Sequence, residues 1–422
     1  MSLPPHDVAD LALAAQGRRR VEYAERAMPV LALLRERFAR DRPLDGLRVA
    51  LCAHLTPETA SLARTLAAGG AQLQLAASNP LSTQDDVAAA LVADDHIGVH
   101  ARYGIDRAGY TAHLLGALDS RPYLLLDDGC DLVHALHTSR TDLLDGLRAG
   151  GEQTSTGVLR LRQMAAEGVL RLPMVALNDT PMQLLVANRH GTGQSTLDAV
   201  MRATGTLLAG TVVVVAGYGW CGSGIAARAR GLGASVVVTE VEPSRALEAV
   251  LDGHRVLPMA EAAALGDVFV TATGNRDVLT AAHFAAMKDG AVLANAGHFD
   301  IEVDVRGLTR TALAVHRRVR PHVDAYELPD GRRLLLVADG RLANLAAAEG
   351  HPASVMDISF AVQALTVQWL AGADLAPGVH QVPAGIDDEV ARTKLAALGL
   401  RLDQLTPAQD RYLSTWRSDP SP

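Results

Sequence analysis

Four valines at 212–215 and one alanine precede three glycines in the spacing GxGxxG, which are Gly217, Gly219 and Gly222. The valines predict a strand buried on both faces, and an alanine-rich helical run and a second strand ending at Glu240 come next. In such a unit the glycines permit a tight turn, close approach of a pyrophosphate and close packing of helix on strand. The Glu240 carboxylate would accept hydrogen bonds from both ribose hydroxyls, which favours NAD over NADP. We therefore predict an NAD site and disfavour the alternative, a glycine-rich turn without a ligand.

Polar clusters follow strands that we expect in the first third of the chain. The expected strands are 47–53, 71–76, 97–101 and 122–126, and the helices between them are 57–68, 84–93 and 107–117. This alternation predicts a parallel sheet with helices on both faces. Ligands bind beyond the carboxyl ends of strands in such sheets, where the clusters 54–59, 78–84 and 127–131 fall.

The remaining segments predict a second sheet and a helical end. Ahead of the first sheet we expect two lead-in helices within 8–40, interrupted near Gly17 and Pro29. Between the two sheets we expect a polar loop at 149–157, a helix at 158–167 and a glycine hinge at 191–193. For the second unit we expect helices 194–208 and 225–232, strands 212–215, 235–239, 255–257, 268–272 and 291–295, and a β-rich segment at 312–337. A helix at 354–371, two amphipathic helices within 386–416 and a disordered SDPSP end follow.

The predicted fold class is α/β, with two doubly wound parallel-sheet domains, the second a Rossmann NAD-binding domain, and a small C-terminal helical segment. The predicted substrate domain spans 1–190 and is completed by 351–385. The NAD-binding domain spans 191–350, and the C-terminal helical segment and tail span 386–422.

Net charge, cysteine spacing and the length of apolar runs limit the kinds of partner that we expect for this chain. Its 422 residues carry a net charge of -8 without a basic stripe, which argues against nucleic acid. Cys52, Cys130 and Cys221 are too scattered for a metal knuckle or a disulfide framework, so we expect no metal and a reducing cytoplasm. Because no apolar run reaches about 18 residues and no export signal is present, we expect no membrane contact.

Seven stretches carry a resemblance to the S-adenosylhomocysteine hydrolase (adenosylhomocysteinase) family. They are HLTPETA (54–60), SNPLSTQDD (78–86), LDDG (126–129), TSTGV (154–158), AGYGWCGSG (216–224), NAGHFD (295–300) and GHPASVMD (350–357). The resemblance covers nearly the whole chain, and the short C-terminus is similar to the compact archaeal and thermophile branch. That branch lacks the basic, tyrosine-containing tail that reaches a neighbouring subunit's cofactor site. The resemblance also implies a homo-oligomer, a tetramer or a dimer.

The resemblance also implies a reaction and roles for residues. In this family tightly held NAD oxidises the ribose 3′-hydroxyl, a carboxylate removes the C4′ proton, the 5′ substituent leaves, water adds, and the ketone is reduced again. Asp128 would be the C4′ base, and His54 and His298 would move protons at the 5′ leaving group. The implied substrate-binding residues are Thr56, Glu58, Thr59, Gln153, Gln183, Asn188, His351 and Met356. The implied cofactor-binding residues are Thr154, Ser155, Thr156, Gly217, Gly219, Trp220, Cys221, Gly222, Glu240, Asn275 and Asn344.

Three positions depart from the family pattern at the ribose hydroxyls. Gln183 stands where the family has the lysine that takes the 3′-hydroxyl proton, and Ala187 stands where it has a supporting aspartate. Gln153 replaces a glutamate that binds ribose hydroxyls. Losing a positioned base typically costs about 10²–10⁴ in rate. Because the elimination and NAD groups are kept, we expect altered sugar chemistry on a nucleoside.

Three functions remain open on the sequence. The first is an NAD-dependent nucleoside enzyme of altered specificity, in particular a 5′-dehydratase (lyase). The second is an S-adenosylhomocysteine hydrolase with His190 or His54 as a substitute base. The third is a non-catalytic regulator that binds NAD or adenosine. Outside the motifs, a histidine after a strand is more often structural, and Asp127-Asp128 could be a turn with a helix cap.

Overall fold

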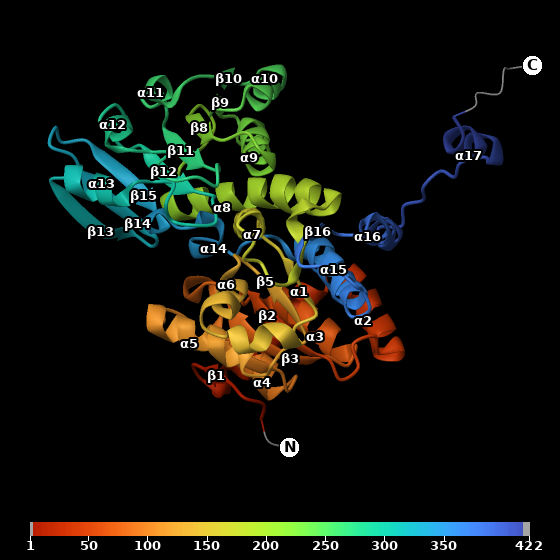
Figure 1. The fold of residues 1–422 in the computed structure, drawn as a ribbon. Helices are drawn as coiled ribbons and strands as arrows, with labels where there is room; N and C mark the ends of the chain where they lie inside the picture. The colour runs from red at the N-terminus through yellow and green to blue at the C-terminus, as the bar shows by residue number, and fades with distance from the viewer. Residues whose placement is uncertain (1–2, 417–422) are drawn as a thin grey trace, which may run out of the picture.

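Two eight-stranded sheets organise residues 3–416, the part of the chain that the computed structural model describes, and they lie in separate lobes (Figure 1). The first sheet has the strand order β1-β4-β3-β2-β5-β6-β7-β16, and every pair in it is parallel. The second has the order β10-β9-β8-β11-β12-β15-β14-β13. It is parallel up to β15 and antiparallel in its last two pairs. The predicted α/β class is confirmed.

The first lobe is built from strands and helices that alternate along the chain. Its strands are β1 (Asp7–Val8), β2 (Arg48–Ala53), β3 (Gln72–Ala77), β4 (Gly98–Ala101), β5 (Leu124–Asp127), β6 (Ala149–Glu152), β7 (Pro173–Ala176) and β16 (Gly378–Gln381). Its helices are α1 (Ala14–Glu25), α2 (Pro29–Asp41), α3 (Pro57–Ala68), α4 (Asp85–Ala93), α5 (Arg107–Leu118), α6 (Asp131–Thr138), α7 (Ser155–Ala166) and α15 (Ala353–Leu370). Side chains of α15 pack in one apolar core with those of β2, β3 and α3.

The second lobe follows a π-helical segment, η5 (Gln183–Gly191), that runs into α8 (Thr192–Thr204). Its strands are β8 (Val212–Ala216), β9 (Ser235–Thr239), β10 (Arg255–Val256), β11 (Val268–Thr271), β12 (Val292–Asn295), β13 (Ala314–Arg320), β14 (Val323–Glu327) and β15 (Arg333–Val337). Its further helices are α9 (Trp220–Gly231), α10 (Pro243–Leu251), α11 (Met259–Ala262), α12 (Ala281–Phe284), α13 (Val305–Thr311) and α14 (Ala343–Ala346).

Both sheets reverse their strand order at a point where ligands commonly bind. In the first sheet the order reverses between β2 and β5, and in the second between β8 and β11. Crevices form beyond the carboxyl ends of the strands at such switch points. His54 directly follows β2 and Asp128 directly follows β5, while Gly217 directly follows β8. The topology therefore places the predicted motifs at the two switch points.

Three details of the sequence prediction differ from the structure. The segment 149–157 is not one polar loop, because 149–152 forms the buried strand β6 and α7 already begins at Ser155. Gly17 does not interrupt a helix but lies inside α1, where a Cβ would come within 1.9 Å of the Asp86 backbone oxygen. A glycine is needed there because α1 packs closely against α4. The glycines at 191–193 lie in the continuous helical run from η5 to α8.

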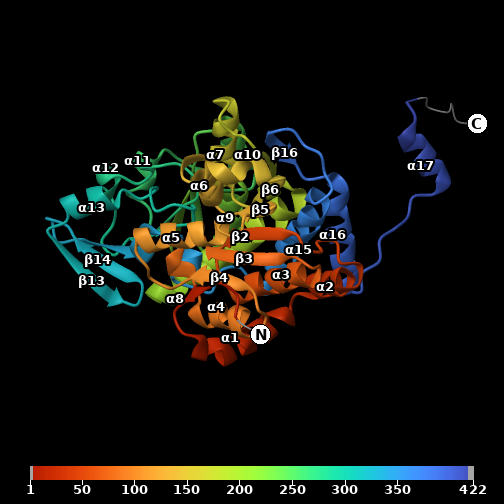
Figure 2. The same cartoon turned by 60° about the horizontal axis from the view of Figure 1, so that its bottom comes forward.

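The chain returns to the first lobe after the second is complete, as α15 and β16 show. The exact domain boundaries remain a prediction. The last two helices, α16 (Ala384–Ala397) and α17 (Pro407–Ser414), lie to one side, and α17 stands away from the body in both views (Figures 1 and 2). The SDPSP end lies outside the described residues. Within 3–416, no helix has the length and apolar character needed to cross a bilayer.

Candidate active site

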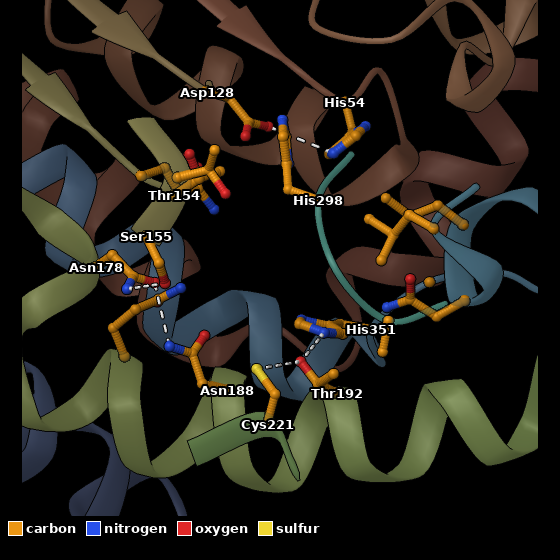
Figure 3. A pocket seen from close by; sticks show the side chains of 18 of the residues that line it. His54, Asp128, Thr154, Ser155, Asn178, Asn188, Thr192, Cys221, His298 and His351 are labelled. Carbon is orange, nitrogen blue, oxygen red and sulfur yellow. Dashed lines mark hydrogen bonds and ion pairs between the residues drawn. The ribbon is translucent and has the colours of Figure 1, made fainter. Parts of the chain in front are cut away.

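A cavity of about 410 Å³ lies between the two lobes and collects most of the predicted residues. Its walls come from loops after β2, β5 and β6, from η5 and α8, and from loops of the second sheet (Figure 3). The predicted residues that line it are His54, Thr56, Glu58, Thr59, Asp128, Gln153, Thr154, Ser155, Thr156, Gln183, Asn188, Gly219, Trp220, Cys221, His298, Asn344, His351 and Met356.

His54, Asp128 and His298 meet at one end of this cavity (Figure 3). His54 Nε2 lies 3.6 Å from Asp128 Oδ2, and the two imidazole rings are 6.3 Å apart between centroids. The other ring nitrogen of His54 shares a hydrogen bond of 2.6 Å with Ser82 Oγ, which fixes the ring orientation. Burial lowers the pKa of His54, Asp128 opposes this and His298 adds to it, so the imidazole is neutral at pH 7.

The Asp128 carboxylate is buried and only partly satisfied. Ser78 Oγ donates to its Oδ2 at 3.2 Å, while its Oδ1 has no hydrogen-bond partner. A buried carboxylate oxygen without a partner is costly, and such atoms concentrate where a ligand completes the site. This oxygen is therefore free to accept a proton or a hydrogen bond from a ligand in the cavity.

Two fully buried carboxylates support the Asp128 loop, and the sequence analysis missed the role of Glu152. Glu152 accepts hydrogen bonds from the backbone N–H groups of Gly129, Cys130 and Thr154. Asp127 accepts from the N–H of Asp128 and of Val133, at the start of α6. Burial raises the pKa of Asp127 to about 7 and that of Glu152 well above its ordinary value. The two side chains fix the loop that presents Asp128.

Neutral side chains form the opposite edge of the cavity. Asn188 Nδ2 donates to Asn178 Oδ1 at 3.2 Å, and Asn178 Nδ2 donates to Ser155 Oγ at 2.8 Å (Figure 3). Gln363 Nε2 donates to Gln153 Oε1 at 2.6 Å, which leaves the Gln153 amide nitrogen available to a ligand. Gln183 is buried in the same wall. Amides and hydroxyls can bind sugar hydroxyl groups but do not accept a proton at neutral pH.

A third side of the cavity carries His351. Its Nε2 lies 3.2 Å from Thr192 Oγ1, and the Cys221 thiol lies 3.7 Å from the same hydroxyl (Figure 3). Burial lowers the pKa of His351 to about 4, so it stays neutral. Thr59 donates to the backbone oxygen of His54, and burial raises the pKa of Glu58. Thr192 and Asn178 were not among the predicted site residues, although both lie close in sequence to the predicted residues Gln183 and Asn188.

Two glycines shape the turn between β8 and α9. Gly217 has a φ of +93°, and a Cβ at Gly222 would lie 1.9 Å from the Gly217 oxygen. The Glu240 carboxylate accepts from the backbone N–H groups of Tyr218, Val241 and Glu242. These bonds hold its pKa low against the opposing effect of burial. Gly217, Gly222, Glu240 and Asn275 do not line the cavity itself, and the first three shape the turn beside it.

Fold and site together define a class, a two-lobed α/β enzyme with a dinucleotide-binding lobe facing an acid–base pocket. Comparison with known proteins gives the family. Residues 5–145 match the model of S-adenosyl-L-homocysteine hydrolase, and 188–350 match that of its NAD binding domain.

Curated relatives match over nearly the full length of the chain. The adenosylhomocysteinase of Thermosynechococcus vestitus is 54% identical over 98% of this chain and 96% of its own. That of Aquifex aeolicus is 53% identical over 97% of this chain and 98% of its own. The S-inosyl-L-homocysteine hydrolase of Methanosarcina acetivorans is 52% identical over 96% of this chain and 98% of its own. The chain belongs to the S-adenosyl-L-homocysteine hydrolase family, and its cofactor is NAD.

Proposed function

We propose that this chain is a nucleoside 5′-dehydratase, which applies the oxidation and elimination chemistry of its family to an adenosine-type nucleoside with an altered sugar. One observation carries the proposal. The ionisable groups His54, Asp128 and His298 are assembled at one end of the cavity, whereas the edge with Gln153 and Gln183 is entirely neutral. A site of this kind keeps the groups for proton removal next to the 5′ carbon but offers no strong base to a plain ribose 3′-hydroxyl.

The residues in the cavity fit NAD. Asn344 Oδ1 is buried without a hydrogen-bond partner, although its Nδ2 donates to Ser195 Oγ at 3.0 Å. A carboxamide N–H of a bound nicotinamide would satisfy this oxygen. Gly219 and Trp220 present the start of α9, whose N-terminus favours a pyrophosphate. When bound, NAD supplies a reversible hydride acceptor for C3′ of the sugar.

The elimination is assigned to side chains of this chain. Asp128 takes the C4′ proton, which the neighbouring C3′ ketone has made acidic, through its unpartnered Oδ1. The C4′–C5′ double bond forms as the C5′–O bond breaks, and His298 protonates the departing hydroxide to give water. His54, neutral and fixed by Ser82, receives the Asp128 proton and passes it on to His298, which returns all three groups to their starting protonation states. C3′ ends at its original oxidation level, so the net change is the loss of one water.

A second candidate is a hydrolase that adds the water back. The names of its relatives favour it, because both adenosylhomocysteinases and an S-inosyl-L-homocysteine hydrolase match at more than 50% identity. It requires a substitute for the family's lysine. His190 is exposed and outside the cavity lining, which leaves His54 as the stronger of the two substitutes. A purely regulatory role gains no support, because the assembled acid–base groups would then have no use.

Product analysis tests the proposal. We expect the purified chain, given nucleosides with a free 5′-hydroxyl and modified sugars, to form a product lighter by one water with a 4′,5′ double bond, seen by mass spectrometry and NMR. With S-adenosylhomocysteine we expect hydrolysis at least about 10² slower than in an ordinary family member, because the 3′ base is missing.

Asp128→Asn is the matched variant, because it keeps size and most hydrogen bonding while removing the base. It is expected to retain NAD and the absorbance of NADH on substrate addition, and to lose C4′ deuterium uptake by about 10² or more. Unchanged deuterium uptake in this variant would assign the proton to another base. Hydrolysis of S-adenosylhomocysteine at an ordinary rate by the unmodified chain would favour the second candidate.

A further inference from the structure

The loops that carry Asp128 and His298 belong to different sheets and meet without a covalent link. Asp128 follows β5 of the first sheet, and His298 follows β12 of the second. Their contact is close, because a Cβ at Gly129 would lie 3.0 Å from His298 Nε2. Gly129 also has a φ of +108°, a conformation that other residues rarely adopt. The distance between base and histidine therefore depends on how the two loops are held together.

Arg160 spans this junction from α7. Its Nη1 donates to the backbone oxygen of Gly129 at 2.8 Å and to Asp131 Oδ1 at 3.2 Å. The face of the same guanidinium lies over the ring of Phe299, with 4.8 Å between Cζ and the ring centroid. Phe299 in turn packs its ring against that of His298, at a centroid distance of 4.7 Å and an interplanar angle of 76°. One side chain thus contacts both loops, each at the residue next to a reacting group.

We propose that Arg160 is a positioning residue, which clamps the His298–Phe299 loop onto the Asp128–Gly129 loop and so sets the geometry of proton transfer. The inference rests on the proposed roles of Asp128 and His298. A planar guanidinium can donate in its plane to a carbonyl while its face stacks on an aromatic ring. Lysine carries the same charge but cannot make both contacts in this geometry.

The ordinary alternative is a surface ion pair between Arg160 and Asp131. The side chains are 46% and 28% exposed, and exposed pairs contribute little to stability. Arg162 gives a matched control for this alternative. It lies two residues further along α7, is 51% exposed, and pairs at 2.5 Å with Asp179, which belongs to neither loop. If only a surface charge matters, Ala substitutions at 160 and 162 will have equal effects.

The five phenylalanines of the chain allow a spectroscopic test of the contact. In NAD-loaded protein labelled with 4-fluorophenylalanine, the ¹⁹F resonance of Phe299 is assigned by Phe299→Leu. We expect Arg160→Ala to shift this resonance and to leave the buried Phe38, Phe269 and Phe284 unchanged. Arg162→Ala is expected to move none of them. A Phe299 resonance that stays in place in Arg160→Ala would overturn the inference, whatever the catalytic activity.

Kinetics of the same variants test the positioning role. We expect C4′ deuterium uptake to fall about 10- to 100-fold in Arg160→Ala, less in Arg160→Lys, and by less than twofold in Arg162→Ala. Bound NAD and the melting temperature are expected to stay unchanged. Equal rates in Arg160→Ala and the unmodified chain would overturn the inference. The dehydratase proposal can fail on its own. It would be contradicted if the unmodified chain exchanged C4′ deuterium normally but formed no unsaturated product, while a shifted Phe299 resonance in Arg160→Ala would still support the contact made by Arg160.

Discussion

Gln183 decides what the cavity can do to a sugar hydroxyl. Its side chain is buried in the wall beside Asn188, and an amide there can orient a hydroxyl but cannot deprotonate it. A lysine at the same place would have its pKa lowered by burial, which is the condition for an amine to act as a base near neutral pH. The substitution and its effect on the reaction remain a proposal.

We predict that Gln183→Lys combined with Ala187→Asp raises S-adenosylhomocysteine hydrolysis by about 10²–10⁴, because the pair restores a supported base. Release of homocysteine measures this rate. Gln183→Arg with Ala187→Asp is the matched control, since arginine carries the charge but stays protonated. A gain in the arginine variant as large as in the lysine variant would show that charge, not proton transfer, is limiting.

The residues of the candidate site were predictable where a motif carried them. His54, Asp128 and His298 each follow a predicted strand, and the packing of the two lobes brings them together. Their catalytic roles stay predictions. Glu152 was not predictable as a support, because its function depends on three backbone N–H groups that only the folded loops place around it. Asn275 is the opposite case. It was expected to bind the cofactor and it follows a strand, but it is exposed and does not line the cavity.

At the scale of the element, strand β6 shows why a sequence pattern can fail. Ala149-Gly-Gly-Glu152 has low intrinsic strand propensity, yet it forms a fully buried parallel strand between β5 and β7. Its glycines are needed because Cβ atoms there would collide with Leu125, Met174 and Leu177. Tertiary packing overrode local preference. By contrast, the valine runs of β8 and β9 were predictable, since they are long and β-branched.

The turn between β8 and α9 yields a prediction for cofactor retention. We expect the unmodified protein to purify with NAD, and Glu240→Ala to bind NAD about tenfold or more weakly, because the carboxylate and its three backbone bonds are lost. The cofactor released by denaturation and a titration of the stripped protein measure this. Glu242→Ala, which removes an exposed carboxylate paired with Arg245, is the control and should change affinity by less than about twofold. Equal losses in both variants would contradict a specific role for Glu240.

At the scale of the whole molecule, the C-terminal arm (398–416) has little contact with the body (Figures 1 and 2). Its exposed leucines are Leu398, Leu400, Leu402, Leu405 and Leu413, each at least 52% exposed. Apolar groups gathered in this way mark an interaction site. We therefore keep the proposal of a homo-oligomer, with a second copy of the chain covering the arm.

Removing 398–422 is predicted to lower the oligomeric state, measured by light scattering after size exclusion at micromolar concentration. The full chain is expected to be a dimer or tetramer, because such an interface buries the five leucines. Removing only 417–422 serves as the control and should leave the mass per particle unchanged. A monomeric full-length chain, or a truncated chain of undiminished mass, would contradict the assignment of the arm.

The return of α15 and β16 to the first lobe has a consequence for synthesis. A nascent chain emerges from the ribosome N-terminus first, and domains fold as units while it does so. The elements of the second lobe, from α8 to α14, have then all been made before α15. Until Ile358, Phe360 and Val362 arrive, the earlier lobe exposes the apolar surface that they cover. We therefore expect the second lobe to complete its fold first during translation, while the first lobe keeps apolar surface exposed until α15 has been made.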